Sequence, residues 1–145
     1  MFSTSHLSGP RRPLASSYRE VNASTAIEGA SPHKLVSLLY HAVAGEIAAA
    51  RGAIARGDIA EKGRAIGKAV RIVEEGLLAP LDLQAGGALA ENLRDLYDYV
   101  VNRLTLGNLK SDDAVLADCA GIVDTLRAGW DAIATQVEAP ARAAA

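Results

Sequence analysis

The sequence predicts an all-α fold, an antiparallel up-and-down bundle of four helices with a mobile N-terminal arm that could form a short extra helix. Apolar residues recur at helical spacing between residues 31 and 137, and no stretch alternates apolar and polar residues for long enough to form a sheet. Helix caps and glycines divide this periodic region into four segments of roughly 20 to 26 residues with short connections, which is typical of such a bundle.

The length and composition suit one globular domain. Half of the 145 residues are apolar and 22% are charged, close to globular averages. The formal net charge of −2 lacks the basic excess of a protein that binds phosphate backbones, so no nucleic-acid partner is expected. No apolar run reaches the roughly 18 residues of a membrane span, so membrane insertion is not expected either. A single cysteine, Cys119, indicates a reducing compartment and hence a cytoplasmic protein.

Residues 1–30 are predicted to be a flexible arm, because they are rich in Ser, Gly, Pro and Thr and their apolar residues follow no sustained period. Helical periodicity starts at Ser31, a preferred N-cap, and Pro32 is tolerated at the first helical position. This helix is expected to run to about Arg56, where Gly57 can adopt the left-handed conformation that ends a helix.

The second helix is predicted to begin after Asp58 and to continue to about Leu78. Asp58 is an N-cap residue, and Glu61 three positions later completes a signal that resembles a capping box. Pro80 follows the end of the helix. Residues 82–87 are predicted to be a loop, because their two consecutive glycines make a helix interior costly.

The third helix is expected over residues 88–106, where Gly107 and the asparagine after it close it. Ser111 or Asp112 is expected to cap the fourth helix, which continues to about Val137. The chain is thus predicted to consist of a flexible arm, a helical-bundle domain and a disordered tail, at residues 1–30, 31–137 and 138–145.

The third predicted helix carries more apolar residues than one bundle contact requires. They sweep about 220° of the helical wheel, against the roughly 100° that a bundle helix needs. The predicted core stripe consists of Leu89, Leu93, Leu96 and Val100. Tyr97 and Val101 lie off this stripe. Two explanations stay open: a central helix that touches several neighbours, or a groove that accepts apolar residues of a partner.

Patterns typical of catalytic, cofactor and metal sites are absent from the sequence. It contains no Glu-x-x-His step, phosphate-binding loop, nucleophile elbow or dinucleotide fingerprint. Cys119 falls on an apolar helical stripe, which favours a core residue over a nucleophile. His41 could be imagined as a phospho-acceptor, but its neighbours lack the lysine and small residues of histidine phosphotransfer domains. We therefore expect no enzymatic activity, no cofactor and no metal.

Three stretches together resemble the FliS family of flagellar export chaperones, which keep flagellin monomeric before its secretion. Residues 30–40 (ASPHKLVSLLY) are similar to the family's opening of the first bundle helix. Residues 54–58 and 66–73 are similar to its motifs around the second helix. Residues 86–99 (GGALAENLRDLYDY) carry the most specific match.

The resemblance implies an antiparallel bundle that binds the C-terminal segment of flagellin along apolar grooves and prevents premature polymerisation. It also implies that the arm can lie over part of the groove when no client is bound, with Tyr18, Val21 and Ile27 as its apolar anchors. The alternative is a regulatory binding module for another export-system client, such as an anti-sigma factor. The candidate partner-binding residues are Tyr18, Leu39, Tyr40, Ala69, Ile72, Asn92, Leu93, Leu96, Tyr97, Val100, Val101 and Leu104.

Further candidate partners are an export-gate component and other flagellar regulators, and the free protein is expected to be a monomer or a weak homodimer. Two residues depart from the family pattern. His41 stands where the family commonly has Asp or Asn, and Glu46 stands where it usually has an apolar residue. Changed local contacts are expected at both positions.

Overall fold

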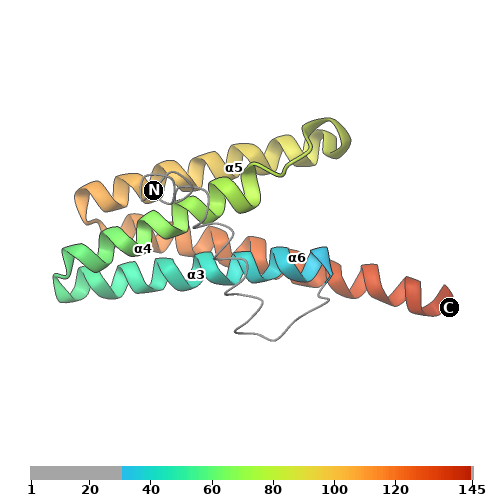
Figure 1. Ribbon diagram of the computed structural model, residues 1–145, viewed down its shortest axis with the longest axis horizontal. Helices are drawn as coiled ribbons and strands as arrows, with labels where there is room; N and C mark the ends of the chain where they lie inside the picture. Colours follow the sequence, from blue (N-terminus) through green and yellow to red (C-terminus); the bar gives the residue numbers. More distant parts are fainter. Residues whose placement is uncertain (1–30, 145) are drawn as a thin grey trace, which may run out of the picture.

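The computed structural model of the protein describes residues 31–144, and its side chains over residues 31–133. The helices are α3 (Pro32–Arg56), α4 (Ile59–Arg71), the π-helix η1 (Ile72–Leu78), α5 (Leu83–Lys110) and α6 (Asp113–Ala144). Because η1 continues α4, four helical rods pack side by side (Figure 1). This part of the chain has no strand, and the predicted all-α fold of four packed helices is confirmed. The division into arm, bundle and tail stays a prediction.

The start and end of α3 follow the local chemistry of the sequence. The Ser31 side chain accepts a hydrogen bond from the Lys34 amide at 3.2 Å, as an N-cap does. Gly57 takes the left-handed conformation, with φ 71°, and its N–H bonds to carbonyl groups of the last helical turn. Asp58 then caps α4 by accepting from the Glu61 amide at 3.1 Å. The predicted caps at these positions are confirmed.

Residues 82–87 form the first turn of α5 and a kink, so the predicted loop is wrong. The Asp82 side chain caps this turn by accepting from the amides of Gln84 and Ala85 at 3.1 and 2.9 Å. The kink lies at Gly87, with φ 56° and ψ −136°, which is non-helical and accessible in practice only to glycine. Residues 83–86 are therefore helical despite the paired glycines, and the helix bends after this first turn.

The end of α5 also differs from the prediction, because the helix passes through Gly107 and stops at Lys110. A Cβ atom on Gly107 would lie 2.7 Å from Leu116 Cδ2 of α6, so the glycine lets α5 pack closely on α6 without a shift of the buried Leu116 side chain. Ser111, with φ 48°, takes the left-handed position after the helix. Asp112 provides the cap of α6, since its Oδ1 accepts from the Ala114 amide at 3.0 Å. α6 itself runs on to Ala144, beyond the predicted end.

The core lies between α3, the α4–η1 rod, α5 and α6, with α3 packed against both α4 and α6. Lys62 of α4 is buried as well, and its Nζ donates to the carbonyl oxygen of Asn108 at 2.9 Å and to Ser111 Oγ at 2.5 Å. These bonds satisfy polar groups at the C-terminal end of α5. In the part of the chain that the structure describes, no helix is both long and apolar enough to cross a membrane.

The predicted core stripe of α5 is wrong in part. Leu89 is 68% exposed and Leu96 is half-buried, whereas Tyr97, placed off the stripe, is buried. Val100 is buried as predicted. The buried face of α5 consists of Ala90, Tyr97, Val100, Leu104 and Gly107. A helical wheel locates a broad apolar arc, but the crossing of α5 over its neighbours decides which part of that arc faces inward.

Candidate functional site

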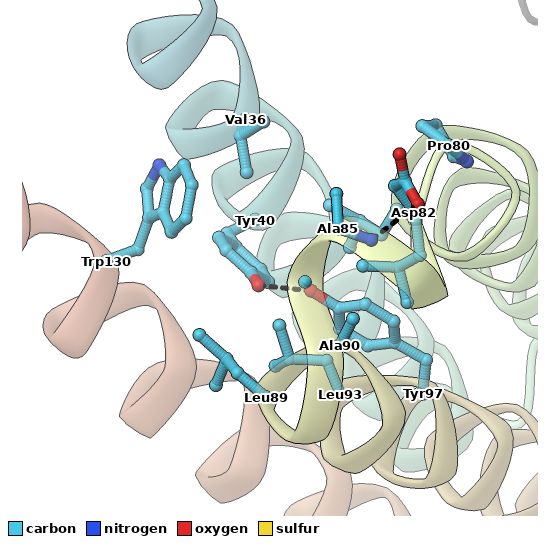
Figure 2. A pocket seen from close by; sticks show the side chains of 14 residues that line it. Val36, Tyr40, Pro80, Asp82, Ala85, Leu89, Ala90, Leu93, Tyr97 and Trp130 are labelled. Carbon is cyan, nitrogen blue, oxygen red and sulfur yellow. Dashed lines mark hydrogen bonds between the residues drawn. The ribbon is translucent and has the colours of Figure 1, made fainter.

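A cavity of about 460 Å³ opens where α3, η1, the start of α5 and α6 meet (Figure 2). Asp82 is the one charged residue among the described residues that line it, and its carboxylate already accepts two backbone amides of its own turn. The cavity is therefore an apolar pocket. Its lining residues are Val36, Tyr40, Gly76, Leu77, Pro80, Leu81, Asp82, Ala85, Gly86, Leu89, Ala90, Leu93, Tyr97 and Trp130.

Two buried tyrosines join α3 to α5 within this lining. The hydroxyl oxygens of Tyr40 and Tyr97 lie 2.5 Å apart and share a hydrogen bond (Figure 2). Burial raises the pKa of Tyr40 and the pKa of Tyr97 above the ordinary value of 10.0, because a phenolate in an apolar interior lacks solvation. Both side chains are thus protonated at neutral pH.

Trp130 forms the α6 wall of the pocket and is locked to the first turn of α3. Its ring stacks on the His33 ring with centroids 4.4 Å apart. Its Nε1–H donates to the His33 carbonyl oxygen at 2.9 Å, and His33 Nε2–H donates to the Trp130 carbonyl oxygen at 2.7 Å. One turn further along α3, the Ser37 hydroxyl donates to Asp131 Oδ1 at 2.6 Å. These contacts hold the indole in place before any partner binds.

The first turn of α5 forms the opposite wall, and the two glycines set its position. A Cβ atom on Gly86 would lie 2.6 Å from the Cβ of Ala90, so the turn packs closely over the helix that follows. The non-helical backbone at Gly87 makes this bend. Leu89 stands beyond the bend at the rim of the pocket, largely exposed.

A second hollow of about 520 Å³ lies between α5 and α6. It is lined by Leu96, Asp118, Gly121, Ile122, Thr125 and Leu126. Leu89, Asn92, Leu96 and Tyr99 recur every three or four residues, which places them on one strip of α5. Because Leu89 belongs to the pocket and Leu96 to the hollow, this strip of α5 connects the two.

The residues predicted to bind a partner fall into three groups. Tyr40, Leu93 and Tyr97 line the pocket, and Leu96 lines the second hollow. Asn92 is exposed on the strip between them. Leu39, Ala69, Ile72, Val100 and Leu104 are buried, and Val101 packs against the core. Tyr18 lies outside the described residues. A role of these residues in binding stays a prediction.

Sequence reasoning missed most of the pocket lining. Pro80 and Leu81 follow the end of the second predicted helix, where no periodicity marks a site. The helical wheel places Leu89 on the core stripe, because the apolar periodicity does not reveal the bend at Gly87. Trp130 is the single tryptophan of the chain, and the sequence pattern places it on the fourth helix. The pattern does not show that it faces the first turn of α5 across a pocket.

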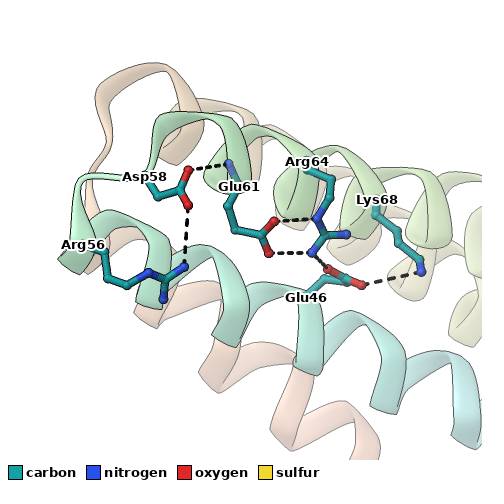
Figure 3. A network of polar contacts seen from close by, with 6 residues as sticks. All are labelled: Glu46, Arg56, Asp58, Glu61, Arg64 and Lys68. Carbon is teal, nitrogen blue, oxygen red and sulfur yellow. Dashed lines mark hydrogen bonds and ion pairs between the residues drawn. The ribbon is translucent and has the colours of Figure 1, made fainter.

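Glu46, which departs from the family pattern, takes part in an ion network between α3 and α4 (Figure 3). Arg64 Nη2 donates to Glu46 Oε1 at 3.0 Å, and Lys68 Nζ lies 3.7 Å from Glu46 Oε2. Arg64 also donates to Glu61 and lowers the pKa of that carboxyl. At the other departure, Arg127 Nη1 donates to Nδ1 of the exposed His41 at 3.2 Å. Both residues therefore bind neighbouring helices.

Reactive and metal-binding side chains do not gather at the pocket. Within residues 31–133, no group of His, Cys, Asp and Glu could hold a metal ion. Cys119 is buried, and burial raises the pKa of its thiol to about 11. It is therefore protonated at neutral pH and poorly nucleophilic, as expected for a core residue.

A family model and several similar proteins point to the same family. The family model described as flagellar protein FliS matches residues 14–137. The flagellar secretion chaperone FliS of Salmonella typhimurium is 35% identical over 116 residues, which are 80% of this chain and 86% of that protein. FliSB of Pseudomonas aeruginosa is 39% identical over 80% of this chain and 91% of its own. FliS of Vibrio cholerae is 34% identical over 80% and 85%.

Proposed function

The chain belongs to the FliS family of flagellar secretion chaperones, and from this premise we propose that it binds the C-terminal segment of flagellin in the cytoplasm. Binding covers the surface through which flagellin polymerises and keeps the client competent for type III secretion. No bond is made or broken, in keeping with a chaperone family.

The observation that supports this proposal is the open apolar pocket and its continuation along α5. An exposed leucine, Leu89, stands at the rim, and the strip through Leu96 and Tyr99 leads from there along the helix. Contiguous exposed apolar surface of this kind marks an interaction site in a soluble domain. An amphipathic client segment can place its apolar side chains in the pocket and hollow while its polar side faces water.

The pocket wall is also held by specific contacts between helices, which favours binding. The His33–Trp130 interlock and the Ser37–Asp131 hydrogen bond hold α6 against α3 on one side. A site that is ordered before its ligand arrives loses less conformational entropy on binding than a flexible one. Because Trp130 lines the pocket, its fluorescence should change when a client segment enters.

The proposal is tested by titrating the protein with a peptide of the last 40 or so residues of flagellin from the same organism, with Trp130 fluorescence and calorimetry as readouts. Leu89→Asp places a charge at the rim and should weaken binding at least tenfold, because the charge would have to be desolvated under the client. Leu109→Asp is the matched control, since Leu109 lies on the same helix outside the pocket and is 81% exposed.

Both leucines are exposed, so neither change should alter folding, which thermal unfolding checks. Equal affinity of the Leu89→Asp and Leu109→Asp variants would show that the pocket is not the client site. Absence of binding by the unchanged protein would contradict the function itself.

A further inference from the structure

The Tyr40–Tyr97 pair carries one more hydroxyl proton than it uses. Each phenol has one O–H donor, and the hydrogen bond between the two oxygens takes up one of the two protons. Among the residues that the structure describes, neither hydroxyl has another hydrogen-bond partner. The second proton therefore has no protein acceptor in this part of the chain.

The place of this spare proton is unusual, because the rest of the pocket is apolar. Both rings are at least nine-tenths buried and line the cavity. Figure 2 shows the two hydroxyl groups meeting in the middle of the lining, between the α3 side and Leu93 on α5. Two other lining side chains carry polar atoms, and both are engaged: the Asp82 carboxylate accepts from amides of its own turn, and the Trp130 Nε1–H donates to the His33 carbonyl oxygen.

A polypeptide that enters such a pocket brings its own polar groups with it. A backbone carbonyl buried against apolar side chains without a donor costs free energy comparable to a lost hydrogen bond. A hydroxyl donor in the lining removes that cost, but only for a carbonyl that reaches the pair. The donor would therefore favour one register of the client over its neighbours.

We propose that the Tyr40–Tyr97 pair donates its spare hydroxyl proton to one backbone carbonyl of the bound client segment and so sets the register of that segment in the pocket. This inference rests on the proposed function, since it names a contact within the same site. Burial keeps both phenols protonated, so the donor is present across the physiological pH range. The two tyrosines are positioning residues for the client backbone.

The first test removes both hydroxyl groups with the double variant Tyr40→Phe/Tyr97→Phe. Because both partners of the internal hydrogen bond are lost together, no buried donor is left unpaired in the free protein, and the stability should change little. Affinity for the flagellin C-terminal peptide should fall about threefold to tenfold, the net value of one hydrogen bond. Urea unfolding of the double variant checks the fold.

The second test changes the client, so that it holds even if the double variant is destabilised. Replacing single peptide bonds of the flagellin peptide with esters, one position at a time, weakens one carbonyl acceptor in each peptide. At one position, the ester peptide should bind the unchanged protein more weakly than the amide peptide does. The double variant should bind the same two peptides equally well. A purely structural role of the tyrosines would not produce this position-specific coupling.

Two outcomes overturn the inference and leave the proposed function intact. One is a folded double variant that binds the peptide as tightly as the unchanged protein. The other is an ester series in which no position loses affinity. If the unchanged protein does not bind the peptide at all, the proposed function and this inference fall together.

Discussion

At the scale of single residues, the polar contacts that join the helices differ in their solvent exposure. Lys62 and Ser37 are buried, and each donates to an acceptor on another part of the chain. The Arg51–Asp113 ion pair between α3 and α6 is well exposed, with side chains 41% and 47% accessible. Buried hydrogen bonds are costly to lose because the remaining group is left without a partner, whereas exposed ion pairs contribute little.

Asp113 offers a test of how an exposed pair depends on pH. Arg51 donates to both of its carboxylate oxygens, at 2.8 and 3.1 Å, and thereby holds the pKa of Asp113 below its ordinary value of 3.8. A carboxyl whose pKa is lowered by folding stabilises the protein above the pKa it has when unfolded. That contribution is lost as the pH falls through the pKa of the folded state.

We expect the Asp113→Asn variant to be less stable than the unchanged protein at pH 7, and the difference to shrink between about pH 4 and pH 2. Urea unfolding at a series of pH values measures this. Arg51→Gln removes the same ion pair from its other side, so this variant should converge with the unchanged protein over the same pH range. A difference for Asp113→Asn that stays constant down to pH 2 would contradict the assignment.

At the scale of elements, glycine decides the course of α5 in two different ways. Gly107 permits the close approach of α5 to Leu116 of α6 without any change of backbone conformation. Gly87 supplies a backbone conformation with φ 56° that lets a single helical turn fold over the pocket. The first glycine serves the packing of the bundle, and the second shapes the candidate site.

The Gly87→Ala variant tests that distinction. An alanine is strained at this backbone conformation by about 1–3 kcal/mol, so the first turn of α5 should move and the pocket wall made by Ala85 and Gly86 with it. Because residues 82–89 are all exposed, the strain should be relieved there, and the rest of the bundle should stay folded. We expect affinity for the flagellin peptide to fall several-fold. This loss should exceed what any decrease in the stability of the bundle accounts for.

Gly45→Ala is the control for this change. Gly45 lies within α3 with open space around its Cα, so alanine there should leave binding unaffected and raise stability by up to about 1 kcal/mol. Circular dichroism with urea unfolding and peptide titration compares the two variants. Unchanged affinity in Gly87→Ala would mean that the bend does not shape the client site.

At the scale of the whole molecule, the candidate site is a gap at one end of the bundle. The start of α5 and the C-terminal half of α6 diverge there, while the opposite ends of these helices stay in contact at Gly107 and Leu116 (Figure 1). An open apolar pocket of this size invites self-association in water. The predicted cover for it is the arm of residues 1–30, which lies outside the described residues, so this role stays a prediction.

Deletion of residues 1–28 tests whether the arm covers the pocket. An arm tethered next to Ser31 has an effective concentration near millimolar, so a few weak contacts through Tyr18 and Val21 suffice to compete with other ligands. The deletion should therefore increase apolar dye binding and dimer formation, as size-exclusion chromatography with light scattering would show, and the flagellin peptide should reverse both. Client affinity should rise or stay level.

A large loss of client affinity on deletion would mean that the arm contacts flagellin directly. No change in dye binding, self-association or affinity would mean that the arm has no part in the site. The full chain with Tyr18→Ser and Val21→Ser is a second variant. It keeps the arm and removes these two anchors, so it separates loss of the anchors from loss of the arm.

The sequence by itself determined those features that depend on neighbouring residues. Two helices begin at the caps Ser31 and Asp58, and one ends at Gly57. A cap or a left-handed backbone acts within a few positions of its own place in the chain, so the sequence is enough to locate it. The motifs in residues 30–40, 54–58, 66–73 and 86–99 together also sufficed for the family. Of the candidate site, Tyr40, Leu93 and Tyr97 could be named in advance because those motifs contain them.

The tertiary structure alone decided which apolar residues form a site and which form the core. Leu89 and Tyr97 lie on the same broad arc of α5, yet one stands at the rim and the other is buried against Tyr40, 57 positions away. Gly107 looked like a helix end and proved to be a packing contact with α6. Periodicity records that a face is apolar, but burial depends on the surfaces of the other helices, and only the packed bundle brings those together.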